Sequence, residues 1–164
     1  MATIQKITPM LWFDGQAEEA ARFYAGIFGG SSIDHISRYG PGAPLPEGTV
    51  LTVEFTLEGQ KFTALNGGPE FKFTPAISFL VSCDTQDEVD HFWDALTVGG
   101  PPEAQQCGWL ADRFGVSWQI IPEALPRFLM DPDPEKSRRT FAAMMPMKKI
   151  DIEALRRAHD GEGA

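Results

Sequence analysis

Two stretches of the chain carry nearly the same order of hydrophobic and polar positions. Residues 10–30 and residues 79–100 each hold an apolar run, an acidic turn residue, an amphipathic stretch with an adjacent aromatic pair, and a closing Gly-Gly pair. A glycine turn that opens a further strand follows in both copies, at residues 59–65 and 115–121. Self-similarity of this kind predicts two similar modules packed together, and a ligand site is expected where such modules meet.

The periodicity of each copy predicts a strand, a helix and then further strands. In the first copy an apolar strand over 4–13 precedes a helix over 16–28, whose buried stripe includes Ala20 and Tyr24 and which Gly29-Gly30 ends. A loop rich in Pro and Gly over 40–48 separates two of the strands that follow. Those strands are expected at 32–39, 49–57 and 60–65, with a hairpin turn at Glu58-Gly59.

The second copy repeats this order and is followed by a tail of different character. A strand over 76–82, a helix over 86–96, a loop over 98–104 and short strands over 105–112 and 116–122 are expected. The fold class is therefore α+β: two tandem βαβββ modules with a C-terminal helical tail. We assign residues 1–69 to the first module, 70–130 to the second and 131–164 to the tail.

The tail shows clear signals for helix starts. Asp133 followed by Pro134 is typical of an N-cap and a first helical position, and the helix is expected to run until Pro146. Asp151 caps a second short helix, expected to end near Ala158. An apolar stripe on this tail needs a covering surface, which is either the second module or a partner in a homodimer. The stripe consists of Phe141, Met144, Met145 and Met147.

Composition and charge exclude several classes of function. The formal net charge of −9 and pI near 4.7 oppose nucleic-acid binding. No apolar run reaches the ~18 residues that a membrane span needs, and the first ten residues lack the apolar region of a signal peptide. We therefore expect a cytoplasmic protein without nucleic-acid or membrane partners. Cys83 and Cys107 match no metal-binding spacing, so both are expected to be reduced thiols.

Several motifs give the chain a family resemblance. The paired modules resemble the vicinal oxygen chelate superfamily, the glyoxalase and bleomycin-resistance proteins. Within it, the chain resembles the PhnB-like family labelled demethylubiquinone methyltransferase, and this resemblance is expected to extend through the tail. The motifs that carry it are Asn66-Gly67-Gly68-Pro69, Phe71-Lys72-Phe73, Cys107-Gly108-Trp109-Leu110, residues 112–119 (DRFGVSWQ) and residues 131–134 (DPDP).

The resemblance implies a divalent metal held by His, Gln or Glu on the first and last strands of each module. The matching positions here are Thr8 or Met10, Thr63, Ser78 and Gln119. Because none is His, Asp or Glu, they match the preferences of divalent metals poorly, and we predict no metal. The family label implies a methyl donor, but a glycine-rich turn after the first strand is missing. We therefore predict no cofactor.

Candidate ligand-binding residues are aromatic or neutral polar side chains expected on inward strand faces. Gln119 is expected to point opposite to both Trp118 and Ile120. The alternative is that the large aromatics are core, while His91 and His159 are expected on solvent faces of helices. No nucleophile–base pair or phosphate loop is present, so no catalytic residue is assigned. The candidates are Trp12, His35, Asn66, Ser78, Trp109, Trp118 and Gln119.

These observations favour a metal-free, homodimeric binding protein for an apolar or aromatic small molecule. Two alternatives remain at this point. The first is an enzyme of the same superfamily, either a metal-dependent lyase or dioxygenase or, as the label suggests, a methyltransferase. The second is a dimeric scaffold whose cavity is filled by its own aromatic side chains.

Overall fold

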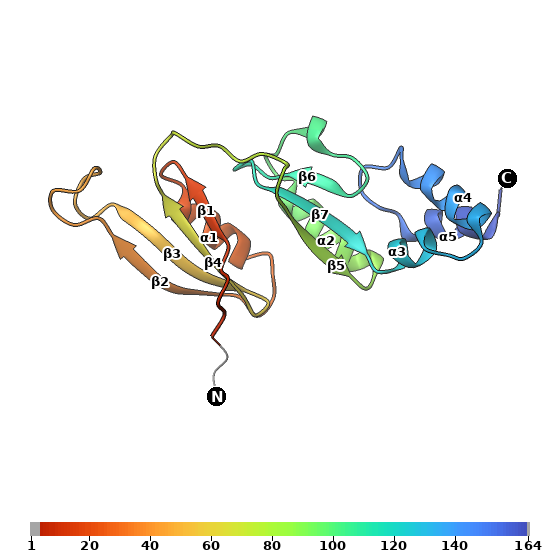
Figure 1. The fold of residues 1–164 in the computed structure, drawn as a ribbon, viewed down its shortest axis with the longest axis horizontal. Helices are drawn as coiled ribbons and strands as arrows, with labels where there is room; N and C mark the ends of the chain where they lie inside the picture. The colour runs from red at the N-terminus through yellow and green to blue at the C-terminus, as the bar shows by residue number, and fades with distance from the viewer. Residues whose placement is uncertain (1–3, 164) are drawn as a thin grey trace. The chain divides into compact units, whose positions relative to one another are not determined.

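A computed structural model describes residues 4–163 (Figure 1). Residues 1–3, with which the expected first module begins, and residue 164, the last of the expected tail, lie outside the described residues. The chain divides into two compact units, Met1–Phe73 and Thr74–Ala164. No helix among the described residues is long and apolar enough to cross a membrane.

The first unit contains a four-stranded sheet covered on one face by a helix. The strands β1 (Met10–Phe13), β2 (Ser32–Arg38), β3 (Val50–Leu57) and β4 (Gln60–Asn66) are arranged in the order β1-β4-β3-β2, with β1 parallel to β4. Helix α1 (Ala17–Ala25) packs mainly on β3 and β4. Tyr24, Val53 and Phe55 are fully buried in this layer. The predicted hairpin turn is confirmed, because Glu58 and Gly59 both have positive φ.

Two details of the first unit differ from the periodicity. Strand β1 begins only at Met10, because Pro9 has no N–H to donate to a ladder; its carbonyl still accepts from the Thr63 N–H at 3.0 Å. In β2 the register shifts between Ile33 and His35, so that Ile33 is opposite Phe55 and His35 is opposite Glu54. Ile33 and His35 therefore lie on opposite faces of the sheet, although strict alternation along the strand would place them on one face, because a bulge reverses the alternation.

The second unit contains a three-stranded sheet and a helix that begins and ends as predicted. Strands β5 (Ser78–Cys83), β6 (Trp109–Ala111) and β7 (Ser117–Pro122) lie in the order β5-β7-β6. Helix α2 (Gln86–Leu96) is capped by the Thr85 side chain. In place of a fourth strand the chain forms the 3-10 helix η1 (Pro102–Ala104), because Pro101 and Pro102 cannot donate to a sheet.

The tail forms three helices, α3 (Ala124–Leu129), α4 (Pro134–Met144) and α5 (Ile152–Asp160). The predicted caps are confirmed, because Asp133 accepts from the Glu135 N–H and Asp151 from the Ala154 N–H, both at 2.9 Å. Helix α3 was not predicted. The α+β class with a C-terminal helical tail is confirmed.

The tail packs on its own unit. Buried Leu125, Ile150 and Leu155 form a cluster. Met144 and Met147 of the predicted apolar stripe pack against it, together with Ile121 of β7. Phe141 and Met145 remain exposed. Part of the stripe is therefore covered within the chain, and the rest faces outward.

His159 is buried in the tail, so its predicted place on a solvent face is wrong. Only 8% of the residue is exposed, its Nε2 lies 2.9 Å from Asp131 Oδ2, and its Nδ1 lies 2.9 Å from Asp160 Oδ1. The Phe128 ring lies 4.7 Å from the imidazole. The hydrogen bonds to Asp160 and then to Asp131 raise the pKa of His159 above its usual range. Arg139 also bonds the carbonyls of Ala158 and His159.

This histidine predicts a pH dependence of stability. A raised pKa in the folded state stabilises the fold fully below the unfolded value of about 6.5. That stabilisation is lost as the pH rises through the folded pKa of His159. The melting temperature of the parent protein should therefore exceed that of His159→Gln most at pH 6 and less at pH 9. Thermal melts across this range test it, and a difference independent of pH would contradict it.

Candidate functional site

The second sheet has one face packed on α2 and one face turned away from it. Along β7 the alternation buries Trp118 and Ile120, while Gln119 and Ile121 are half-buried on the other face. The register places Gln119 beside both Leu80 of β5 and Trp109 of β6. Gln119 therefore points to the face opposite that of Trp118 and Ile120, as expected from the alternation of side chains along a pleated strand.

A pocket of about 300 Å³ lies on this free face. Its lining is mostly apolar, with one amide and one thiol among aromatic and aliphatic groups, and it is open to solvent. The lining residues are Leu80, Cys107, Trp109, Gln119, Ile121, Leu125, Pro126, Leu129 and Met144. Sites of this composition take apolar or aromatic ligands and fix them by a few polar groups.

The Gln119 amide is the polar group on the pocket floor. Its Nε2 donates to Ser78 Oγ at 2.9 Å, which orients the amide. Among residues 4–163 no hydrogen bond to its Oε1 is formed. No buried side-chain N or O atom in the described chain lacks a partner, so this oxygen is accessible. It can therefore accept one hydrogen bond from a ligand.

Two further hollows adjoin the pocket. One, of about 350 Å³, shares Cys107 and Trp109 with it and reaches Ala104 and Gln106. The other, of about 570 Å³, shares Leu80, Ile121 and Pro126 and extends along α3. Both hollows thus share lining residues with the pocket.

Cys107 stands between two of these hollows at the tip of a tight turn. It has φ of 50° and Gly108 has φ of 85°, and the turn is closed by a bridge between Gln106 and Trp109. Its Sγ donates to the Met145 carbonyl at 3.3 Å and lies 3.5 Å from that of Met144. Its N–H donates to the Met147 carbonyl at 2.7 Å. The turn therefore joins the sheet to the tail.

Trp118, a predicted ligand-binding residue, belongs to the core instead. It is 3% exposed, and its Nε1 donates to Asp112 Oδ2 at 2.9 Å. The other carboxylate oxygen of Asp112 accepts from the N–H groups of Phe114 and Val116. The DRFGVSWQ motif is therefore mainly a structural turn, and Gln119 is its pocket-facing residue.

In the first unit the predicted residues do not form one cluster. Asn66 is 2% exposed; its Oδ1 accepts from the Ala17 N–H at 2.9 Å and its Nδ2 donates to the Val50 carbonyl at 3.0 Å. Both ends of its amide are used within the fold, which gives it a structural role, and its contact with a ligand stays a prediction. Half-buried Trp12 donates its indole N–H to the Gly68 carbonyl at 2.9 Å.

His35 is exposed on the outer strand β2, opposite Glu54. Contact of Trp12 or His35 with a ligand stays a prediction. The structure brings Ser78, Trp109 and Gln119 together on the second sheet, which is the strongest grouping of the predicted residues.

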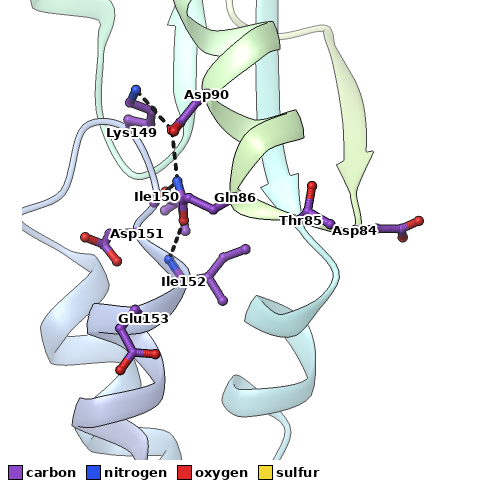
Figure 2. Close-up of a pocket in the computed structure, with 9 residues that line it drawn as sticks. All are labelled: Asp84, Thr85, Gln86, Asp90, Lys149, Ile150, Asp151, Ile152 and Glu153. Atoms are coloured by element: carbon purple, nitrogen blue, oxygen red, sulfur yellow. Dashed lines mark hydrogen bonds and ion pairs between the residues drawn. The ribbon is translucent and has the colours of Figure 1, made fainter.

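The hollow between α2 and the start of α5 holds about 600 Å³ (Figure 2). Gln86 crosses it: its Nε2 donates to the Ile150 carbonyl and to Asp90, and its Oε1 accepts from the Ile152 N–H at 2.8 Å. Asp90 also pairs with Lys149 at 3.1 Å, and the bonds from Gln86 and Lys149 lower the pKa of Asp90. These polar groups pair with one another and join α2 to residues 149–152, so they attach the tail to the rest of its unit.

The positions expected to hold a metal do not fit one. Met10 and Thr63 are register partners in the first unit, and Ser78 and Gln119 are bonded to each other in the second. They offer a thioether, hydroxyls and an amide, without an imidazole or carboxylate. Within the described part of the chain, no group of three or more His, Cys, Asp or Glu side chains could hold a metal ion.

Comparisons with known proteins find one family and a set of solved structures. The family model described as 3-demethylubiquinone-9 3-methyltransferase matches residues 5–121. The PhnB protein from Bacillus cereus is 41% identical, with 72% of this chain and 99% of that chain covered and a TM-score of 0.64. Protein PA1353 from Pseudomonas aeruginosa is 24% identical over 74% of this chain and 98% of that one, with a TM-score of 0.57.

None of the curated proteins matches the sequence. We expected the family resemblance to continue through the tail, but the residues matched by the model end at 121. Helices α3, α4 and α5 therefore lie outside the matched part.

Proposed function

We propose that this chain, which belongs to the PhnB-like family described as 3-demethylubiquinone-9 3-methyltransferase, is a binding protein for an apolar or aromatic small molecule. The observation that carries this proposal is the pocket on the free face of the second sheet, with Trp109 at its wall and the accessible amide oxygen of Gln119 on its floor. The proposal keeps the resemblance to the vicinal oxygen chelate superfamily that the paired modules of the sequence indicate.

The size and chemistry of the pocket define a ligand class. An apolar cavity of about 150 Å³ holds benzene, so a pocket of about 300 Å³ has room for one or two aromatic rings. The Trp109 ring offers a stacking surface, and Gln119 Oε1 accepts one hydrogen bond. The ligand class is therefore a one- or two-ring aromatic molecule with a single O–H or N–H donor.

The proposal includes a metal-free homodimer. The poor donor set supports the first part. Exposed Phe141 on α4 and Met145 directly after this helix offer an apolar surface for a second copy. Native mass spectrometry of gently purified protein tests both parts, since it reports subunit number, bound metal and any retained organic molecule. A stoichiometric transition metal would overturn the metal-free assignment, and a monomer would overturn the dimer.

A methyltransferase, the activity in the family description, lacks support in the geometry. Methyl donors of the adenosylmethionine type usually bind beside a glycine-rich turn between a parallel strand and a helix. Here the turn from β1 to α1 holds the single glycine Gly15, and the turn from β5 to α2 holds none. Titration of S-adenosylmethionine by calorimetry tests this conclusion, and saturable binding would favour the enzyme.

Replacing Gln119 by leucine should weaken binding of a hydroxyl-bearing ligand without closing the pocket. Loss of one neutral hydrogen bond, about 1 kcal/mol, should lower the affinity for 1-naphthol about fivefold and leave that for naphthalene nearly unchanged. Calorimetric titration of both compounds measures the ratio. Gln60→Leu, at an exposed position in the first unit, is the matched control. Equal weakening of both ligands would contradict the assigned role of the amide.

A further inference from the structure

The pocket has walls of two origins. Leu80, Trp109, Gln119 and Ile121 come from the sheet and lie within the residues that match the family model. Leu125, Pro126 and Leu129 come from α3 and Met144 comes from α4, all beyond the last matched residue. The wall formed by the sheet thus lies within the residues that match the family model. The opposite wall is formed by the tail, which lies outside them.

We propose that Leu129 and Met144 set the size of the ligand that the pocket accepts. This inference rests on the proposed binding function and assigns selectivity within that same site. The sheet supplies the ring contact and the hydrogen bond, and the tail decides how many rings fit.

These two side chains are better placed for that role than Leu125. Leu125 is 4% exposed and forms the tail core with Ile150 and Leu155. Leu129 and Met144 are only partly buried and pack at the border of that core while lining the pocket. Changing them alters the pocket more than the core. Methionine also adapts its shape readily, because it is unbranched with three rotatable bonds.

The hairpin tip at Cys107 holds the tail wall in place. The Cys107 N–H bonds the Met147 carbonyl at 2.7 Å, and the Gly108 N–H bonds the Lys148 carbonyl at 2.8 Å. The Cys107 thiol contacts the carbonyls of Met144 and Met145. Since Trp109 follows this tip directly, the end of α4 is tied to the strand that carries the aromatic wall. The distance across the pocket is therefore set by hydrogen bonds of the backbone.

Shortening Met144 should widen the range of ligands. The affinities of Met144→Ala for 9-phenanthrol, with three rings, and for 1-naphthol, with two, are measured by calorimetric titration. Their ratio should rise at least tenfold in favour of the larger compound relative to the parent protein. Met145→Ala is the matched control, because Met145 is the next residue, is 42% exposed and does not line the pocket. Met144→Phe keeps an apolar side chain against the tail core and should shift the ratio in the opposite direction.

The outcomes separate this inference from the function on which it rests. Unchanged ratios in both Met144 variants, with the Gln119→Leu effect on 1-naphthol intact, would overturn the role of the tail and leave the binding function standing. Equal shifts in Met144→Ala and Met145→Ala would also overturn it. Failure of the parent protein to bind any of the three aromatic compounds would overturn both. Circular dichroism confirms that each variant is folded before titration.

Discussion

Asp112→Ala is expected to lower the free energy of unfolding by about 3 kcal/mol. Asp112 is 1% exposed, and its carboxylate accepts hydrogen bonds from the N–H groups of Phe114 and Val116 and from the indole N–H of Trp118. Val116 and Trp118 are both 3% exposed. Alanine would leave buried donors without an acceptor, and each such donor costs about 1–3 kcal/mol.

A matched series separates lost hydrogen bonds from lost charge. Asp112→Asn keeps one carbonyl oxygen, which can serve the two backbone donors, but presents an amide N–H₂ group toward Trp118. Its loss should be intermediate. Asp87→Ala, at an exposed position on α2, should change stability by less than about 0.5 kcal/mol. Urea denaturation followed by circular dichroism measures all three, and a loss below about 1 kcal/mol for Asp112→Ala would refute the structural role of this carboxylate.

Local periodicity was sufficient to predict most of the fold. The bounds of α2 were predicted to the residue, and the caps Asp133 and Asp151 were identified from residue type alone. Both signals are local, since the apolar face of a helix and its N-cap are each defined by residues that are close together in the sequence. Helix α3 was missed because Pro126 lies inside it, and a proline within a short apolar run is usually a sign against a helix.

The candidate site depended on contacts that no local pattern contains. The pleat of β7 correctly indicated the orientation of Gln119, but the neighbouring Trp118 was assigned to the pocket because its acceptor Asp112 was not foreseen. His159 was misplaced for a similar reason, as its partner Asp131 precedes it by 28 residues. The tail wall of the pocket also comes from helices remote in sequence, so the apolar stripe predicted packing without showing that Met144 lines a cavity.

The Gly-Gly pairs that close the two copies look equivalent in sequence but differ in their surroundings. A Cβ added at Gly29 would have no heavy atom within 4 Å, whereas one at Gly100 would lie well inside contact distance of the Ala111 carbonyl oxygen. The Gly100 N–H also bonds the Thr97 carbonyl at 3.0 Å, which fixes the approach. Helix α1 ends at Ala25 with Gly26 as its C-cap, so the expectation that Gly29-Gly30 ends this helix is wrong. Gly29 therefore meets no steric requirement, whereas Gly100 permits close passage of the chain past β6.

Gly100→Ala is therefore expected to destabilise the protein by about 2–4 kcal/mol, because the clash is with backbone and cannot be relieved by a side-chain rotation. Gly29→Ala, at a glycine of the other pair that has open space and no positive φ, is the control and should change stability by less than about 0.5 kcal/mol. Denaturant unfolding of both variants provides the comparison. Ala111 lies two residues after Trp109 on β6 and pairs with Ser117, which lies two residues before Gln119 on β7. Because a shift of Ala111 would move this ladder, Gly100→Ala should also weaken 1-naphthol binding, and Gly29→Ala should not. Equal effects of the two substitutions would contradict the role assigned to the close approach at Gly100.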